Sequence, residues 1–90
     1  LRLNTNQINR LENILQDLNI PYIPSSANFI TLKFNNENEA KSFTRKFLEN
    51  GVILRHLDSF GLPECVRVTI GSELEMDYFI NKLEFVMEYV

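Results

Sequence analysis

The stretch that decides the fold is GVILRHLDSFGLPECVRVTIGSELE, residues 51–75. It holds two short runs rich in aliphatic residues, 52–57 and 66–70, separated by the turn-forming segment DSFGLPE. This pattern predicts two strands that pair as a hairpin-like unit. Each strand carries an arginine near its middle, Arg55 and Arg67, where strand propensity favours an aliphatic residue. These two arginines need an explanation.

The segment ANFITLKF, residues 27–34, alternates between two kinds of side chain and predicts a further strand. Successive side chains of a strand point to opposite faces of the sheet. One face of this strand therefore carries Ile30, Leu32 and Phe34, and the other carries Phe29, Thr31 and Lys33.

Three segments show apolar residues at helical spacing. We expect the first helix to run from Asn4, with an Asn or Thr as its cap, to a point before Pro21. The segment PYIPSS, residues 21–26, follows it. Because this segment holds two prolines and two serines, we expect an extended connector there.

The other two helices each begin with capping-box spacing, in which a polar residue precedes a glutamate by three positions. The pairs are Asn36 with Glu39, and Ser72 with Glu75. The second helix is expected to end at Asn50 and Gly51, because asparagine and especially glycine readily take the left-handed conformation that closes helices.

The expected order of elements is α-β-α-β-β-α, which makes an α+β fold, a two-layer α/β sandwich. No repeat, linker or low-complexity stretch divides the chain, and 90 residues suit one domain. If the helices cover the aliphatic face of the sheet, Arg67 and Thr69 lie on the opposite face with Thr31 and Lys33. The sequence thus predicts a polar and basic face that meets water or a partner.

Composition excludes several classes of function. The formal net charge is −3 and the nine Lys and Arg residues form no run, so a nucleic-acid footprint is absent from the sequence. One cysteine and one histidine cannot form a disulfide or a metal cluster, which favours a reducing, cytoplasmic setting. No apolar run has the length of a membrane span. The chain opens on Leu1 rather than Met, so we expect a piece of a longer protein.

Arg67 and Arg55 each have two interpretations. Either is explained by an exposed arginine on the polar side of a half-buried strand. The alternative is anion recognition, because a guanidinium stays charged and offers a planar fork that matches carboxylate or phosphate. His56 has no evident catalytic partner, and Cys65 is expected to be a packing residue. The residues therefore predict an anion-binding pair without a complete catalytic apparatus or a metal site.

Two stretches resemble a known family. PSSANFITLKF and NGVILRHLDSFGLPECVRVTIGSELEMDYFINKLE are similar to the C-terminal small domain of histidinol-phosphate aminotransferases, which belong to the pyridoxal-phosphate aminotransferases of fold type I. The shared pattern is a Ser, Ala, Asn, Phe strand, a Gly-Val-Ile-Leu-Arg strand, a Gly-Leu-Pro turn and a Val-Arg-Val-Thr-Ile-Gly strand. The resemblance covers essentially all of residues 1–90, which it identifies as one small, substrate-recognition domain.

The resemblance implies roles for both arginines. The arginine that Arg67 matches binds the α-carboxylate of the amino-acid substrate, and the one that Arg55 matches joins it in holding the phosphate of histidinol phosphate. The implied reaction converts histidinol phosphate and 2-oxoglutarate into imidazole acetol phosphate and glutamate, in histidine biosynthesis. One site must then accept two anionic substrates in turn.

The resemblance also implies what lies elsewhere. The Schiff-base lysine and the residues that hold pyridoxal phosphate belong to a large domain outside this chain, and the parent enzyme is a homodimer. We therefore expect no catalytic and no cofactor-binding residue among residues 1–90, and no activity from this chain alone.

Other functions stay open at this point. Threonine-phosphate decarboxylases and aromatic aminotransferases share the layout. From a different class, a non-catalytic ACT or ferredoxin-like module would bind a small molecule. Such modules run β-α-β-β-α-β, whereas this chain is expected to start and end with a helix.

Overall fold

The computed structural model describes residues 2–24 and 28–90, and within them the side chains from Thr5 onward. Residues 25–27 lie outside the described residues; they hold the end of the expected connector, Ser25 and Ser26, and the start of the predicted Ser, Ala, Asn, Phe motif, Ser26 and Ala27. In chain order the elements are α1 (Arg2–Asp17), β1 (Tyr22–Ile23), β2 (Phe29–Lys33), α2 (Glu37–Glu49), β3 (Arg55–His56), the 3-10 turn η1 (Asp58–Phe60), β4 (Cys65–Thr69) and α3 (Glu73–Met87).

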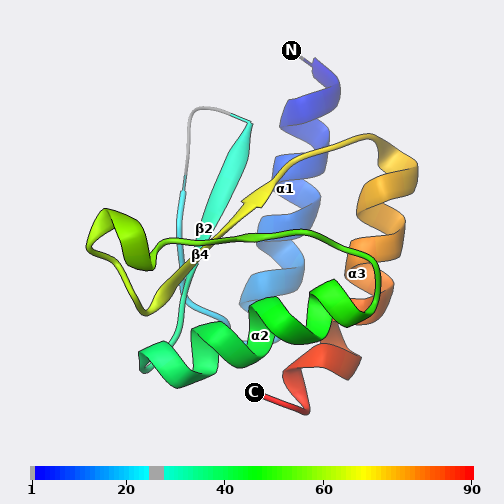
Figure 1. Ribbon diagram of the computed structural model, residues 1–90. Helices are drawn as coiled ribbons and strands as arrows, with labels where there is room; N and C mark the ends of the chain where they lie inside the picture. Colours follow the sequence, from blue (N-terminus) through cyan, green and yellow to red (C-terminus); the bar gives the residue numbers. More distant parts are fainter. Residues whose placement is uncertain (1, 25–27) are drawn as a thin grey trace.

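A small antiparallel sheet and three helices make up the fold, so the expected mixture of helix and strand is confirmed (Figure 1). The strand order is β1-β2-β4-β3. The predicted order of elements was incomplete, because residues 22–23 of the expected connector form β1 and pair with β2. Pro21 and Pro24 confine this strand to two residues, since proline cannot donate to a sheet ladder.

The pairing of β3 with β4 confirms the expected hairpin-like unit, but β3 is shorter than predicted. Only Arg55 and His56 pair with β4, and residues 52–54 leave the sheet. Val52 instead donates its N–H to the carbonyl of Phe47, 2.8 Å away, which ties the segment to the end of α2. Among the described residues, the end of β4 beside residues 52–54 therefore has no strand paired to it on that side.

Helix ends follow the predicted capping chemistry in α2 and α3 but not in α1. The helix α1 begins at Arg2, so the prediction that an Asn or Thr near Asn4 caps it was wrong. It ends through Asn19, whose φ of 59° is left-handed. In α2, Asn36 accepts from the N–H of Glu39, as its spacing predicted.

The capping box of α3 is complete. The Ser72 hydroxyl accepts from the N–H of Glu75 at 3.2 Å, and the Glu75 carboxylate accepts from the N–H of Ser72 at 2.8 Å. The two backbone N–H groups, of Ser72 and Glu75, would otherwise lack a hydrogen-bond acceptor at the start of the helix. This box fixes where the chain turns from β4 into α3.

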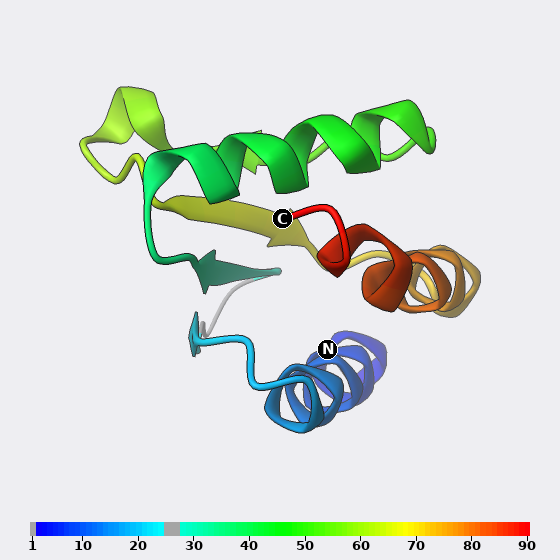
Figure 2. The same ribbon diagram turned by 90° about the horizontal axis from the view of Figure 1, so that it is seen from below.

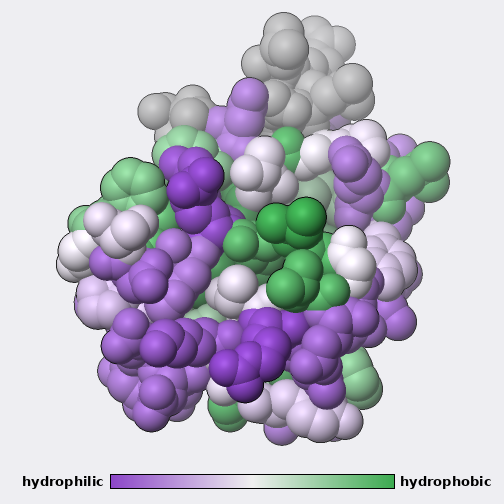
Figure 3. Space-filling view, in the orientation of Figure 1, coloured by the Kyte–Doolittle hydropathy of each residue, from purple (hydrophilic) through white to green (hydrophobic). Residues whose placement is uncertain are grey.

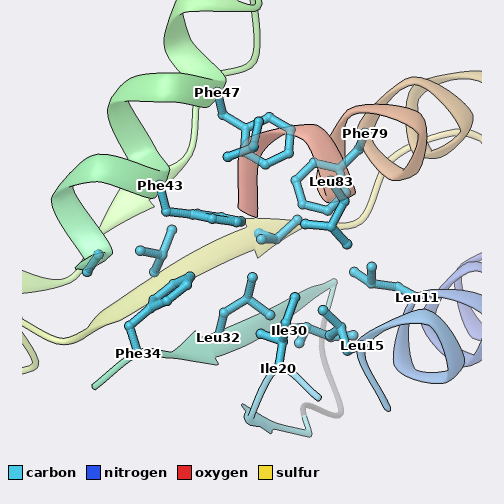
Figure 4. Close-up of a cluster of buried hydrophobic side chains, with 14 of the residues drawn as sticks. Leu11, Leu15, Ile20, Ile30, Leu32, Phe34, Phe43, Phe47, Phe79 and Leu83 are labelled. Carbon is cyan, nitrogen blue, oxygen red and sulfur yellow. The ribbon is translucent and has the colours of Figure 1, made fainter. Parts of the chain in front are cut away.

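One hydrophobic core holds the sheet and all three helices together (Figure 4). The helix α2 lies below the strands in Figure 1, and α1 and α3 stand side by side in Figures 1 and 2. The rings of Phe47 and Phe79 stack at 4.6 Å between α2 and α3. The sheet contributes Ile30, Leu32, Val66 and Val68, and the helices contribute Leu11, Leu15, Ala40, Phe43, Phe47, Met76, Phe79, Leu83 and Val86.

These buried sheet residues are the predicted aliphatic face, so the other face of β2 and β4 points away from this core. Within residues 2–24 and 28–90, no helix has the length and hydrophobicity needed to span a membrane.

Gly71 provides a test of the α3 capping box. A Cβ at this position would collide with the Glu75 carboxylate. We expect Gly71→Ala to displace that carboxylate and to lower the free energy of unfolding by about 1 kcal/mol, the usual value of a helix cap. Urea unfolding of the 90-residue chain, followed by circular dichroism, measures the loss. If Gly71→Ala and Ser72→Ala lower the free energy of unfolding equally, and the variant with both changes loses no more, the loss comes from the capping box. Unchanged stability of Gly71→Ala would contradict this account.

Candidate functional site

Four side chains form a row across the sheet, one from each strand. The register sets Arg55 opposite Arg67, Arg67 opposite Thr31, and Thr31 opposite Ile23. Directly opposite residues of antiparallel strands share a face, so both guanidinium groups stand on the face away from the core. The structure therefore brings the two sequence-predicted site residues together as cross-strand neighbours.

The two arginines of this row have the same charge and no acidic partner. Arg67 is half-buried and Arg55 is exposed. In the described part of the chain, neither guanidinium lies within 4.0 Å of a carboxylate, although Arg10, Lys41 and Lys46 each form an ion pair. Like charges directly opposite each other destabilise a sheet by about 0.2–1 kcal/mol. An anion between them would reverse this repulsion into attraction.

Aromatic rings take the place of acids beside these arginines. The Arg67 Cζ lies 4.8 Å from the ring centroid of Phe29, and the Arg55 Cζ lies 5.9 Å from that of Phe60. Both distances are within the range of cation–π attraction. Phe60 belongs to η1 and is 62 % exposed, so the closer and better enclosed contact is the one between Arg67 and Phe29.

His56 fixes the strand that carries Arg55. Its Nε2–H donates to the Pro63 carbonyl at 2.6 Å, and only 13 % of its side chain is exposed. This bond joins β3 to the turn before β4, where only two residues of β3 pair with the sheet. The sequence offered no catalytic partner for His56, and the structure shows its ring as a link between β3 and the turn before β4.

A pocket of about 580 Å³ lies beside the arginine row, where the sheet opens. Residues 51–54 form one wall, the end of β4 another and the start of α3 a third. At its border Ile53 is 85 % and Leu74 is 80 % exposed. Figure 3 shows hydrophobic surface in the middle of this face, with hydrophilic surface around it. Ile53 and Thr69 are two residues from Arg55 and Arg67, so the pocket adjoins the row.

The remaining candidate, Cys65, is buried at 2 % exposure. Burial raises the pKa of the Cys65 thiol, with the Glu64 charge adding to the effect and Lys33 opposing it, so Cys65 is a packing residue as expected. Among the described residues, no group of three His, Cys, Asp or Glu could hold a metal ion.

Sequence reasoning identified neither the contact between Phe29 and Arg67 nor the pocket. Alternation placed Phe29 on the arginine face but could not show that it lies diagonally across from Arg67, because that depends on how β2 and β4 pair. The pocket lies where β3 begins later than expected, at Arg55. The aliphatic run 52–57 predicted a strand from its first residue and therefore did not indicate the pocket.

Known proteins resemble this chain over most of its length. The sequence model of the family described as aminotransferase class I and II matches residues 4–83. The histidinol-phosphate aminotransferase of Campylobacter concisus is 39 % identical over 85 residues, which are 94 % of this chain and 23 % of that protein. That of Wolinella succinogenes is 36 % identical over 90 residues, 100 % of this chain and 23 % of that protein.

A solved structure resembles the fold as well. The histidinol-phosphate aminotransferase of Sinorhizobium meliloti, in complex with pyridoxal-5'-phosphate, superposes with a TM-score of 0.86 at 22 % identity. The match covers 96 % of this chain and 24 % of that one. The chain thus spans about a quarter of the length of the relatives that it matches.

Proposed function

Because this chain belongs to the class I and II aminotransferases, we propose that it is the C-terminal small domain of a pyridoxal-phosphate-dependent histidinol-phosphate aminotransferase. Its share of the curated relatives, 23 % of each, supports a domain of a larger parent enzyme. We also propose that the three helices and the sheet form two layers; the TM-score of 0.86 to one histidinol-phosphate aminotransferase supports the likeness of the overall fold.

The observation that carries this proposal is the facing pair Arg55 and Arg67, which has no carboxylate partner among the described residues. We call this pair the anion clamp. Two guanidinium groups directly opposite each other repel, which costs stability when no anion is bound. A bound phosphate or carboxylate accepts hydrogen bonds from both and removes the repulsion.

Each arginine has a distinct role in the proposal. Arg67, half-buried in the middle of β4, binds the carboxylate of glutamate or 2-oxoglutarate through its two parallel N–H donors. Arg55, exposed on the edge strand β3, adds its charge when the phosphate of histidinol phosphate occupies the same place. Holding the anion fixes the amino group at the reaction centre, which contributes to the rate by positioning.

Pyridoxal phosphate, when bound to the parent enzyme, supplies the electron sink for amino-group transfer. The described residues do not fit it. Lys41 and Lys46 pair with glutamates of their own helix, Lys82 lies 5.6 Å from the Tyr78 ring, and Lys33 is exposed at the end of β2. The larger part of the parent chain therefore holds the cofactor.

That larger part also covers the exposed apolar surface at the pocket. Ile53 and Leu74 stand almost fully in solvent in this chain, and Ile53 lies two residues from Arg55 of the clamp. Packing the rest of the parent enzyme against them would remove apolar area from water and shield the clamp, which strengthens its attraction for anions. We further propose that the parent enzyme is a homodimer and that it is cytoplasmic.

Assays of the purified full-length parent test the substrate. We expect transamination of histidinol phosphate with 2-oxoglutarate to exceed that of aromatic amino acids, because a dianionic phosphate ester gains more from the two charges of the clamp than a single carboxylate does. Preferred turnover of aromatic amino acids, or decarboxylation of threonine phosphate, would assign the chain to one of those related activities. The ACT-type alternative has no support, because the family match covers residues 4–83.

The 90-residue chain alone is expected neither to bind pyridoxal phosphate covalently nor to transaminate. Its described lysines are paired or on the surface, so none has the desolvated setting that activates a lysine. Incubation with the cofactor, dialysis and a visible spectrum test this expectation, with the full-length parent as the positive control. A stoichiometric absorption band that survives dialysis of the 90-residue chain would overturn it.

A further inference from the structure

We infer that Phe29 positions the guanidinium of Arg67 for anion binding, as an aromatic support under the clamp; this inference rests on the proposed function. Phe29 is the first residue of β2 and stands opposite Thr69, two residues along β4 from Arg67. Diagonal neighbours of this kind are within reach of long side chains. The Arg67 Cζ lies 4.8 Å from the Phe29 centroid, the shorter of the two arginine–ring contacts on this face.

A neutral ring suits this position better than an acid. A carboxylate beside Arg67 would neutralise its charge and occupy the N–H donors that the substrate needs. The Phe29 ring attracts the cation through its π-face without accepting those hydrogen bonds. No carboxylate of the described chain lies within 4.0 Å of Arg67, so its donors stay available for a substrate.

The support also opposes two effects that would misplace Arg67. Arg55 stands directly opposite and repels it. A long arginine side chain also loses rotamer entropy when it is fixed in one position. The contact with Phe29 holds the guanidinium before the anion arrives, so less ordering remains to be done on binding.

Phe29 is not part of the hydrophobic core cluster, which contains its neighbours Ile30 and Leu32. Its half-buried ring lies on the arginine face instead. Replacing it with another apolar residue of similar size should therefore leave the fold intact. This separation allows a positioning role to be measured apart from stability.

Steady-state kinetics of the full-length holoenzyme with glutamate test the inference. Phe29→Leu removes the π-face and is expected to raise KM about threefold to tenfold with kcat changed less than twofold, the size of a partly desolvated cation–π contact. Phe29→Tyr keeps the face and should stay within twofold of the wild type. Tyr89→Leu is the matched control, because it removes a ring 4.0 Å from the Lys46 Nζ, between α2 and the C-terminal residues. It should change nothing.

The double variant separates positioning from direct contact. In an Arg67→Ala background, Phe29→Leu should have no further effect on KM, because Phe29 acts through Arg67. An unchanged KM in Phe29→Leu, with Arg67→Ala defective, overturns the inference and leaves the proposed function standing. An equal effect of Phe29→Leu in both backgrounds also overturns it. If Arg67→Ala itself keeps full activity, the proposed function fails and the inference fails with it.

Discussion

Arg67→Ala in the full-length parent enzyme is expected to lower kcat/KM for glutamate at least about thirtyfold. This factor corresponds to a loss of about 2 to 5 kcal/mol of substrate or transition-state binding free energy. The substrate carboxylate would lose both parallel N–H donors of a half-buried guanidinium and would be left without its partner. Steady-state kinetics over a range of glutamate concentrations measure the loss.

Arg67→Lys provides the sharper version of this test. It keeps the positive charge but not the planar fork, so it should also fail. A change of less than threefold in kcat/KM for either variant would mean that Arg67 is a surface arginine on the polar side of β4. Arg45→Ala serves as the control, because Arg45 lies on α2, outside the clamp.

Arg55→Ala is expected to weaken histidinol phosphate at least tenfold, about 1.4 kcal/mol, and glutamate distinctly less. Arg55 stands opposite Arg67 on the same sheet face, so its charge is available to whichever anion Arg67 holds. A second cation gains more from a dianionic phosphate ester than from a single carboxylate. The ratio of the two kcat/KM values, variant against wild type, measures this difference.

The competing interpretation of Arg55 is an exposed arginine of an edge strand, which contributes little to either substrate. Equal losses for histidinol phosphate and glutamate would exclude Arg55 from phosphate recognition. The substrate assignment would then lose its main support within this chain, although the aminotransferase family would stand.

Most of the fold follows from local patterns in the sequence. Period-two alternation predicted which face of β2 is buried, and the structure confirms it for Ile30 and Leu32. The capping box of Ser72 and Glu75 predicted the start of α3. These signals lie within a few residues of the element that they mark, which is why they can be read from sequence.

The errors in the predicted fold concern contacts between distant parts of the chain. The strand β1 exists only because residues 22–23 pair with β2, and its two residues are too few for a periodic pattern. Likewise β3 is short because Val52 bonds to the end of α2 rather than to β4. Neither of these tertiary contacts can be predicted from the local amino-acid composition.

Only part of the candidate site could be predicted from the sequence. Two arginines within aliphatic runs allowed anion recognition, but the runs alone favoured exposed surface residues. The register, which sets Arg55 opposite Arg67, favours the anion interpretation because it creates a repulsion that a ligand would relieve. Phe29 entered the site through the same register.

The central claim is that Arg55 and Arg67 hold one anion together, and a double-mutant cycle with histidinol phosphate tests it most directly. The dissociation constants of the holoenzyme, Arg55→Ala, Arg67→Ala and the double variant are compared. Two arginines that share one phosphate should be coupled by at least about 0.5 kcal/mol, because each holds the group that the other binds. Losses that add within about 0.3 kcal/mol, or single variants that bind like the wild type, would contradict a shared anion clamp.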